Sequence, residues 1–147
     1  MADPVVVIQA TLAPIFLVNG AAIFLNFTQA RLFRVIDRLR ALDKEIKDAE
    51  EAARLALQRE RTRNIRRAVI LRNAILFGVL VIGLTVATTL LLLWGGTHES
   101  ARMSFAPIYA LSAALISFAV ALALVSTDSF LSVAAARAGF RELVPHR

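Results

Sequence analysis

The sequence contains no cysteine, which excludes a disulfide, a thiolate metal site and a cysteine nucleophile. Its two histidines, His98 and His146, are distant from each other and have no companion residues at metal-ligand spacing. There is also no glycine-rich phosphate loop and no Ser-x-x-Lys motif. We therefore predict that the protein is not an enzyme and has no catalytic, metal-binding or cofactor-binding residues.

Positive charge is missing from the beginning of the chain, where MADPVVVIQ holds no lysine or arginine. A secretory signal peptide needs basic residues there, so we expect the first apolar block to be retained as a membrane span. Helix-breaking residues are also scarce, because no glycine or proline lies between Gly20 and Ile46. A helix that begins in the apolar block is therefore predicted to continue into a charged segment.

Apolar residues, in contrast, are abundant: they make up 58% of the 147 residues, against about 45–50% in soluble domains. They gather in three blocks, each long enough for a helix to cross the ~30 Å hydrocarbon core of a membrane. The pattern predicts an all-α integral membrane protein with three transmembrane helices and a long cytosolic helical hairpin. The expected single membrane domain, 1–147, comprises span one at 5–30, the cytosolic hairpin at 31–68, span two at 69–94, an outer loop at 95–103, span three at 104–125 and a cytosolic tail helix at 129–143.

The distribution of charge predicts the orientation in the membrane. Thirteen of the 17 lysines and arginines lie between Arg31 and Arg72, and the positive-inside rule places such a segment in the cytoplasm. The N-terminus is then outside and the C-terminus cytoplasmic. The same segment holds seven of the 11 acidic residues and carries the whole net charge of +6. Because the two signs are interspersed, we interpret it as a solvated hairpin and expect no nucleic acid among the partners.

Each helix of the predicted hairpin has a side with apolar residues that need a surface to cover them, either the other helix of the hairpin or a neighbouring chain. On the first helix, apolar residues recur at spacings of three and four, as on one face of an amphipathic helix. They are Leu32, Val35, Leu39, Leu42 and Ile46. On the second helix this side consists of Leu55, Gln58, Thr62, Ile65 and Val69. The chain must turn between the two helices, and we place this turn within 47–53.

Polar residues form a line along one face of span one. Asn19, Asn26 and Gln29 share this face with Ile15, Ala22 and Phe33, at spacings of three and four. An amide in lipid costs free energy unless it is hydrogen-bonded. Two interpretations remain open. The amides either bond to other helices, within the protomer or between subunits, or they line a water-filled pore of a homo-oligomer.

Four arginines follow span one at the predicted inner membrane surface: Arg31, Arg34, Arg38 and Arg40, the basic collar. One interpretation is anchoring to anionic lipid, worth about 1 kcal/mol per residue near the surface. In a pore, the same arginines would ring the inner mouth and favour anions. Asp37 would partly neutralise their field.

Two features of span three and its end stand out. Ala113, Ser117 and Ala121 form a ridge of small residues, which lets helices approach closely inside a bilayer. Asp128 follows at the predicted inner edge of the membrane. We expect it to cap the tail helix. A proton or cation site is the alternative, because an ionisable residue in a span is a functional candidate.

The segment from Arg31 to Arg40 reads R-L-x-R-x-x-D-R-x-R, and a second basic segment, Arg66 to Asn73, leads into span two. In these segments the chain resembles a bacterial family of small three-span membrane proteins, domain of unknown function 2721. The matching positions of the first motif are Arg31, Leu32, Arg34, Asp37, Arg38 and Arg40. The resemblance extends over about 8–125. It implies a multi-pass protein of the bacterial inner membrane and no settled activity.

Two functions fit these features. The first is a homo-oligomer in the inner membrane that forms an ion-conducting pore lined by the polar face of span one. The alternative is a non-conducting scaffold or accessory subunit whose cytosolic hairpin binds a partner. The expected partners are therefore the lipid bilayer, further copies of the chain and a cytosolic protein.

Overall fold

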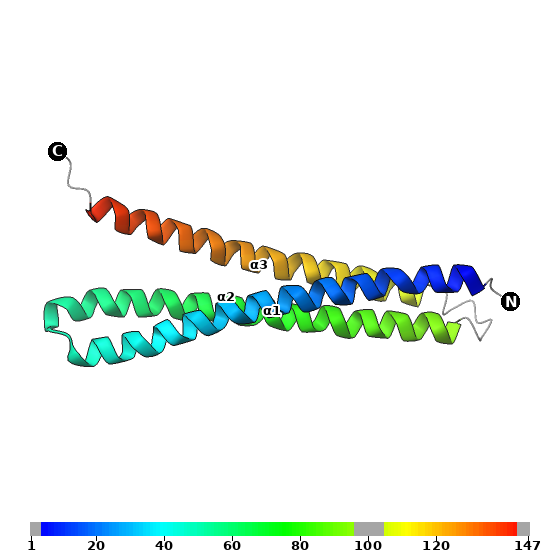
Figure 1. Cartoon of the computed structure of the whole chain (residues 1–147), viewed down its shortest axis with the longest axis horizontal. Helices are drawn as coiled ribbons and strands as arrows, with labels where there is room; N and C mark the ends of the chain where they lie inside the picture. Colours follow the sequence, from blue (N-terminus) through cyan, green and yellow to red (C-terminus); the bar gives the residue numbers. More distant parts are fainter. Residues whose placement is uncertain (1–3, 96–104, 144–147) are drawn as a thin grey trace.

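The chain folds into three long helices, and the hairpin and spans are parts of them (Figure 1). The computed structural model describes the backbone of residues 4–95 and 105–143, with side chains at 12, 14–94 and 105–134. The helices are α1 (Pro4–Asp48), α2 (Glu51–Gly95) and α3 (Ala106–Leu143). The described part of the chain contains no strand. The all-helical prediction is therefore confirmed, whereas the outer loop and both histidines lie largely or wholly outside the described residues.

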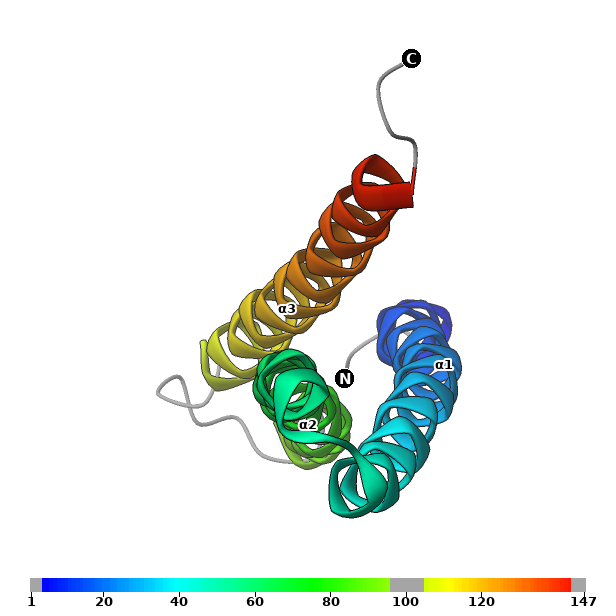
Figure 2. The ribbon, with the colours of Figure 1, turned by 90° about the vertical axis from the view of Figure 1, so that its left-hand side faces the viewer.

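Helix α2 is the central element of the fold. Both α1 and α3 pack along it, whereas the backbones of α1 and α3 approach each other at few positions. The side chains of Phe24 in α1 and Phe118 in α3 meet edge to face, with ring centres 5.6 Å apart. Figure 2 shows α1 and α3 diverging on two sides of α2.

The hairpin turn consists of Ala49 and Glu50, within the expected range. The Glu50 carbonyl accepts hydrogen bonds from the backbone N–H groups of Ala53 and Arg54, so it begins α2 without a glycine or proline.

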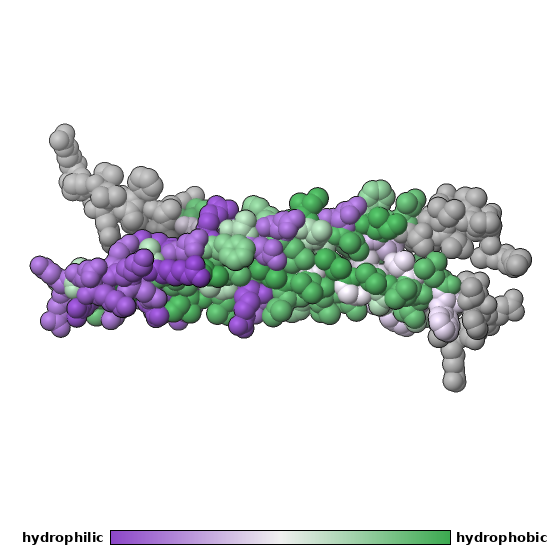
Figure 3. Space-filling model, turned by 60° about the horizontal axis from the view of Figure 1, so that its bottom comes forward, coloured by the Kyte–Doolittle hydropathy of each residue, from purple (hydrophilic) through white to green (hydrophobic). Residues whose placement is uncertain are grey.

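Each helix contains a segment that is long and apolar enough to cross a membrane. A helix of 45 residues, such as α1 or α2, is ~68 Å long and therefore more than twice the ~30 Å of the hydrocarbon core. The excess length of both helices forms the hairpin. On the face drawn in Figure 3, the hairpin is hydrophilic and the coloured surface beyond it is largely apolar. The prediction of three candidate spans is thus confirmed.

The packed face of α1 agrees with the predicted one. Val35 and Leu42 are buried, and Leu32, Leu39 and Ile46 are partly buried. Val35 joins Leu71, Ala74 and Val125 in a core cluster that draws on all three helices. The spacing of three and four therefore identified the correct face of this helix.

The packed face of α2 is not the side with apolar residues that the sequence indicates. All five residues of that side are exposed: Leu55, Gln58, Thr62, Ile65 and Val69. Instead Asn64 is buried and Glu60 and Arg67 are partly buried. Two ion pairs at the edge of this interface also join α2 to α1, Arg38 to Glu60 at 3.0 Å and Arg61 to Asp43 at 2.7 Å. Apolar residues lie on both sides of α2, so their spacing alone did not identify the packed side.

Helix α3 continues through the residues at which a new helix was expected to begin. The hydroxyl of Thr127 donates to the Ala123 carbonyl at 2.8 Å, and that of Ser129 to the Val125 carbonyl at 3.0 Å. Because these hydroxyls bond back to their own helix, they do not compete with it as caps. The prediction that Asp128 caps a separate tail helix was therefore wrong.

Candidate functional site

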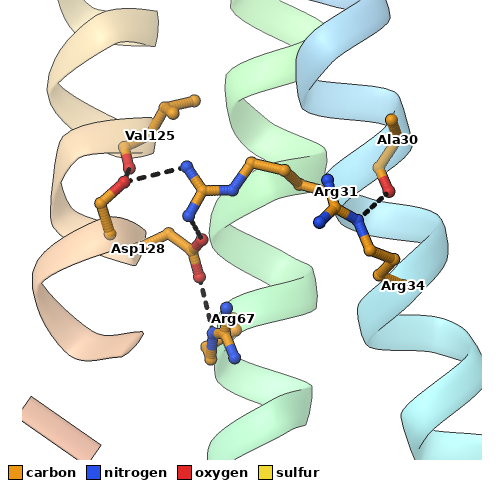
Figure 4. Close-up of polar contacts among 7 residues, drawn as sticks. Ala30, Arg31, Arg34, Arg67, Val125 and Asp128 are labelled. Atoms are coloured by element: carbon orange, nitrogen blue, oxygen red, sulfur yellow. Dashed lines mark hydrogen bonds and ion pairs between the residues drawn. The ribbon is translucent and has the colours of Figure 1, made fainter. Parts of the chain in front are cut away.

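Charged side chains from all three helices meet in the space between them: Arg31 of α1, Arg67 of α2 and Asp128 of α3 (Figure 4). We call them the ionic cluster. Arg31 Nη2 lies 3.0 Å from Asp128 Oδ2, and Arg67 Nε donates to Oδ1 at 2.8 Å. Asp128 is completely buried. A single carboxylate thus connects α3 to both helices of the hairpin.

Helix periodicity places Asp128 in this position. The buried residues of α3 recur at spacings of three and four, so they form one line toward α2: Ala114, Ser117, Ala121, Val125 and Asp128. Arg31 is the first charged residue after the apolar part of α1, and Arg67 lies shortly before the apolar part of α2. The sequence contained this signal, since extending the line from Ala121 through Val125 reaches Asp128, but the partners could not be read from it.

The cluster carries more positive than negative charge. Moving a carboxylate out of water costs several kcal/mol, which ion pairs must offset. Two guanidinium groups share the one charge of Asp128, and Arg31 also donates from Nη1 to Ser129 Oγ at 2.9 Å. Arg31 lies 5.5 Å from the ring centre of Phe27, within reach of a cation–π contact. Asp128 Oδ2 has the close contact with Arg31 but no well-aligned hydrogen bond among the described residues.

The polar face of α1, Asn19, Asn26 and Gln29, points away from α2. All three side chains are exposed, and none forms a hydrogen bond with a residue that the structure describes. Ile15 and Phe33 on the same face are exposed as well, at 52% and 64%. The described part of the protomer therefore provides these amides with no hydrogen-bond partner.

The basic collar divides into residues with different surroundings. Arg31 belongs to the ionic cluster, and Arg38 pairs with Glu45 at 2.9 Å as well as with Glu60. Arg34 is exposed, and its Nε donates to the Ala30 carbonyl at 3.3 Å. Arg40 is also exposed and lies 3.4 Å from Asp37. The four arginines therefore have different partners and do not form one uniform basic surface.

The small-residue ridge of α3 is only partly at a helix interface. Ser117 and Ala121 are buried, but Ala113 is exposed and its neighbour Ala114 is buried in its place. On α2, Thr85 and Thr88 are buried and donate to carbonyls of their own helix, at 2.7 and 2.8 Å. Small residues and satisfied hydroxyls let the two helices approach closely.

Three apolar helices, a polar hairpin and a charged cluster between them define a small, all-helical membrane protein with three candidate spans. The chain belongs to the family described as a protein of unknown function, DUF2721, whose model matches residues 11–138. This confirms the resemblance carried by the segment from Arg31 to Arg40. No curated protein and no solved structure matches the chain.

Proposed function

We propose that the protein is a homo-oligomer of the bacterial inner membrane, oriented with its N-terminus outside and its C-terminus in the cytoplasm. Its subunits meet around an axis that the polar face of α1 lines, and ions cross the membrane along this axis. The observation that carries the proposal is the exposure of Asn19, Asn26 and Gln29 on a helix that is apolar enough to span a membrane.

The free energy of an amide in hydrocarbon supports an assembly. Each unsatisfied polar group in the bilayer core costs several kcal/mol. Asn19 and Asn26 are two helical turns apart, ~10.5 Å along the axis, and Gln29 extends the line to ~15 Å. The polar face thus covers about half of the ~30 Å hydrocarbon thickness. Water in a central axis, or the amides of neighbouring subunits, would satisfy all three side chains.

The arrangement of the helices requires several copies for such an axis. Because α1 and α3 both pack on α2 and the polar face of α1 is exposed, one chain encloses no channel between its described helices. At the hairpin end of the polar face lies Arg40, whose charge Asp37 partly offsets. An axis with this mouth would favour anions.

Conductance and subunit contacts test the proposal together. Wild-type protein reconstituted in planar bilayers should give discrete conductance that favours chloride over potassium. Replacing both Asn19 and Asn26 with leucine should reduce this conductance at least tenfold. The matched control is Ser112→Leu, which changes an exposed polar residue of the α3 span without touching α1.

Crosslinking separates the two parts of the proposal. The chain has no cysteine, so a single Asn26→Cys variant reports contacts between subunits directly. If Asn26→Cys crosslinks into oligomers but the wild-type protein shows no conductance above background, the pore is refuted. The polar face is then an interface between subunits. Absence of crosslinks in native membranes, with Ser112→Cys equally unreactive, would refute the assembly through α1.

One observation favours the alternative of a non-conducting scaffold. A groove of about 630 Å³ lies between the hairpin part of α2 and α3. It includes Leu55 and Leu131, which are 64% and 40% exposed. A photo-crosslinker at Leu55 should capture a cytosolic protein if the hairpin is a docking element. Recovery of self-contacts alone would count against this function.

A further inference from the structure

A second feature of the described surface is a pocket of about 310 Å³ beside the ionic cluster. Its volume falls at the lower end of the ~300–1,000 Å³ range of small-molecule sites. Its lining, which we call the basic pocket, draws on all three helices and includes four arginines and no acidic residue: Arg31, Arg34, Val35, Arg38, Asn64, Arg67 and Ser132.

The arginines of the basic pocket are incompletely neutralised. Asp128 lies behind the pocket and shares one negative charge between Arg31 and Arg67. Arg34 forms no ion pair with any carboxylate in the part of the chain that the structure describes. Only Arg38 is fully compensated, by Glu45 and Glu60. Positive charge is therefore in excess at the end formed by Arg31, Arg34 and Arg67.

Hydrogen-bond donors remain available in the same place. Arg67 and Arg34 each use Nε, for Asp128 and for the Ala30 carbonyl, so their terminal nitrogens are uncommitted among the described residues (Figure 4). The Ser132 hydroxyl also has no hydrogen bond to a described residue. Asn64 is 6% exposed and is fixed by a bond to the Glu60 carbonyl at 3.2 Å. Guanidinium groups with two free nitrogens match the oxygens of a phosphate.

We propose that the basic pocket binds a phosphate group, with Arg34 and Arg67 as its charged ligands and Ser132 and Asn64 as neutral ones. This site goes beyond the assembly proposed above and does not depend on it. Arg31, the first charged residue after the apolar part of α1, lines the pocket, so the pocket lies where the apolar sequence of this helix gives way to the charged hairpin. Basic pockets between helices at such a level accept lipid headgroups. The phosphate therefore belongs either to a membrane phospholipid or to a soluble phosphate compound.

Titration of the purified full-length protein in non-ionic detergent tests the site. The probes are short-chain phosphatidylglycerol, diacylglycerol with the same acyl chains and no phosphate, and inorganic phosphate alone. We expect saturable binding of a phosphate-bearing probe, one per chain, and none of diacylglycerol. Arg34→Gln should weaken it about tenfold, the equivalent of one charge-assisted interaction. Ser132→Ala should weaken it by a smaller factor without changing the charge.

The matched control is Arg40→Gln, which removes the same charge from the same helix outside the pocket and should weaken binding less than about twofold. Arg34 is exposed and holds no other helix, so its variant should keep the wild-type unfolding temperature. If phosphatidylglycerol binds and inorganic phosphate does not, the source is a lipid headgroup. If inorganic phosphate also saturates with the same dependence on Arg34, the source is a soluble phosphate compound.

Three results would overturn the proposal. The first is that neither phosphate-bearing probe saturates. The second is that diacylglycerol binds as tightly as phosphatidylglycerol, which would show that the acyl chains alone are recognised. The third is that Arg34→Gln and Arg40→Gln have equal effects, because the attraction would then come from the general surface charge.

Discussion

Arg67 of α2 donates a hydrogen bond from Nε to Oδ1 of Asp128 of α3 at 2.8 Å, although 61 positions separate the two residues in the sequence. The same carboxylate is reached by Arg31 of α1. Because Asp128 pairs with a residue of each of the other two helices, it is the main polar connection among the three helices in the described structure. Beyond this level, α3 and the hairpin separate (Figure 1).

Replacing Asp128 with asparagine should lower the free energy of unfolding by about 3 kcal/mol, because two partly buried guanidinium groups lose their counter-charge. Thermal and chemical unfolding in detergent micelles would measure the loss. Asp37→Asn is the control, since Asp37 is 71% exposed and its pair with Arg40 contributes at most ~1 kcal/mol.

A second variant tests whether charge imbalance causes that loss. Asp128→Asn combined with Arg67→Gln should be more stable than the sum of the two single changes predicts, because it removes one charge of each sign. Strict additivity of the two substitutions would contradict a direct coupling between Asp128 and Arg67.

Gly78 of α2 lies in close contact with Leu25 of α1. A Cβ atom there would lie 2.7 Å from Leu25 Cδ2 and 3.2 Å from Cγ. Gly78→Ala should therefore destabilise the fold by about 1–3 kcal/mol through overpacking. Gly83→Ala is the matched control: nothing lies within 4 Å of its added Cβ, and it should gain up to ~1 kcal/mol in helix propensity. Equal effects of the two substitutions in unfolding experiments would refute the close approach.

Thr85→Val should change the free energy of unfolding by less than about 1 kcal/mol. The hydroxyl of Thr85 is buried but donates to the Val81 carbonyl of its own helix at 2.7 Å, so valine keeps the shape and loses no bond between helices. A loss of ~2 kcal/mol or more in the same unfolding assay would indicate that the hydroxyl bonds to another helix.

The orientation in the membrane can be measured with single cysteines in this cysteine-free chain. Glu50→Cys in the hairpin turn should react with a membrane-impermeant thiol reagent only after the membrane is permeabilised. Phe105→Cys, at the opposite end and 63% exposed, should react in intact cells. The reverse labelling pattern would contradict the positive-inside assignment.

Several features of the fold could be predicted because they depend on local sequence. The spacing of Leu32, Val35 and Leu39 predicted the packed face of α1, since this helix has one apolar side next to its charged one. The expected range of the hairpin turn was correct as well. On α2, apolar residues occur on both sides, and Leu55 and Ile65 are exposed, so their spacing did not indicate which side packs.

The ionic cluster could not be predicted in the same way. Asp128 was expected to cap a tail helix, because residues 126–129 are of the types that favour N-caps. However, the hydroxyls of Thr127 and Ser129 bond to carbonyls of their own helix, which continues through this segment. Its true partners depend on how each helix is rotated about its axis and how far it slides along its neighbour. Neither quantity is encoded within a single helix.

The sequence by itself determined that this protein is helical, that three segments can cross a membrane, and that a charged hairpin joins the first two. These properties follow from composition and from the period of apolar residues, which act over a few turns of helix. Only the tertiary structure decided that Asn19 and Asn26 face outward and that Arg31, Arg67 and Asp128 meet. The physical reason is that burial of a charge is stable only with its partners in contact, and those partners come from three different helices.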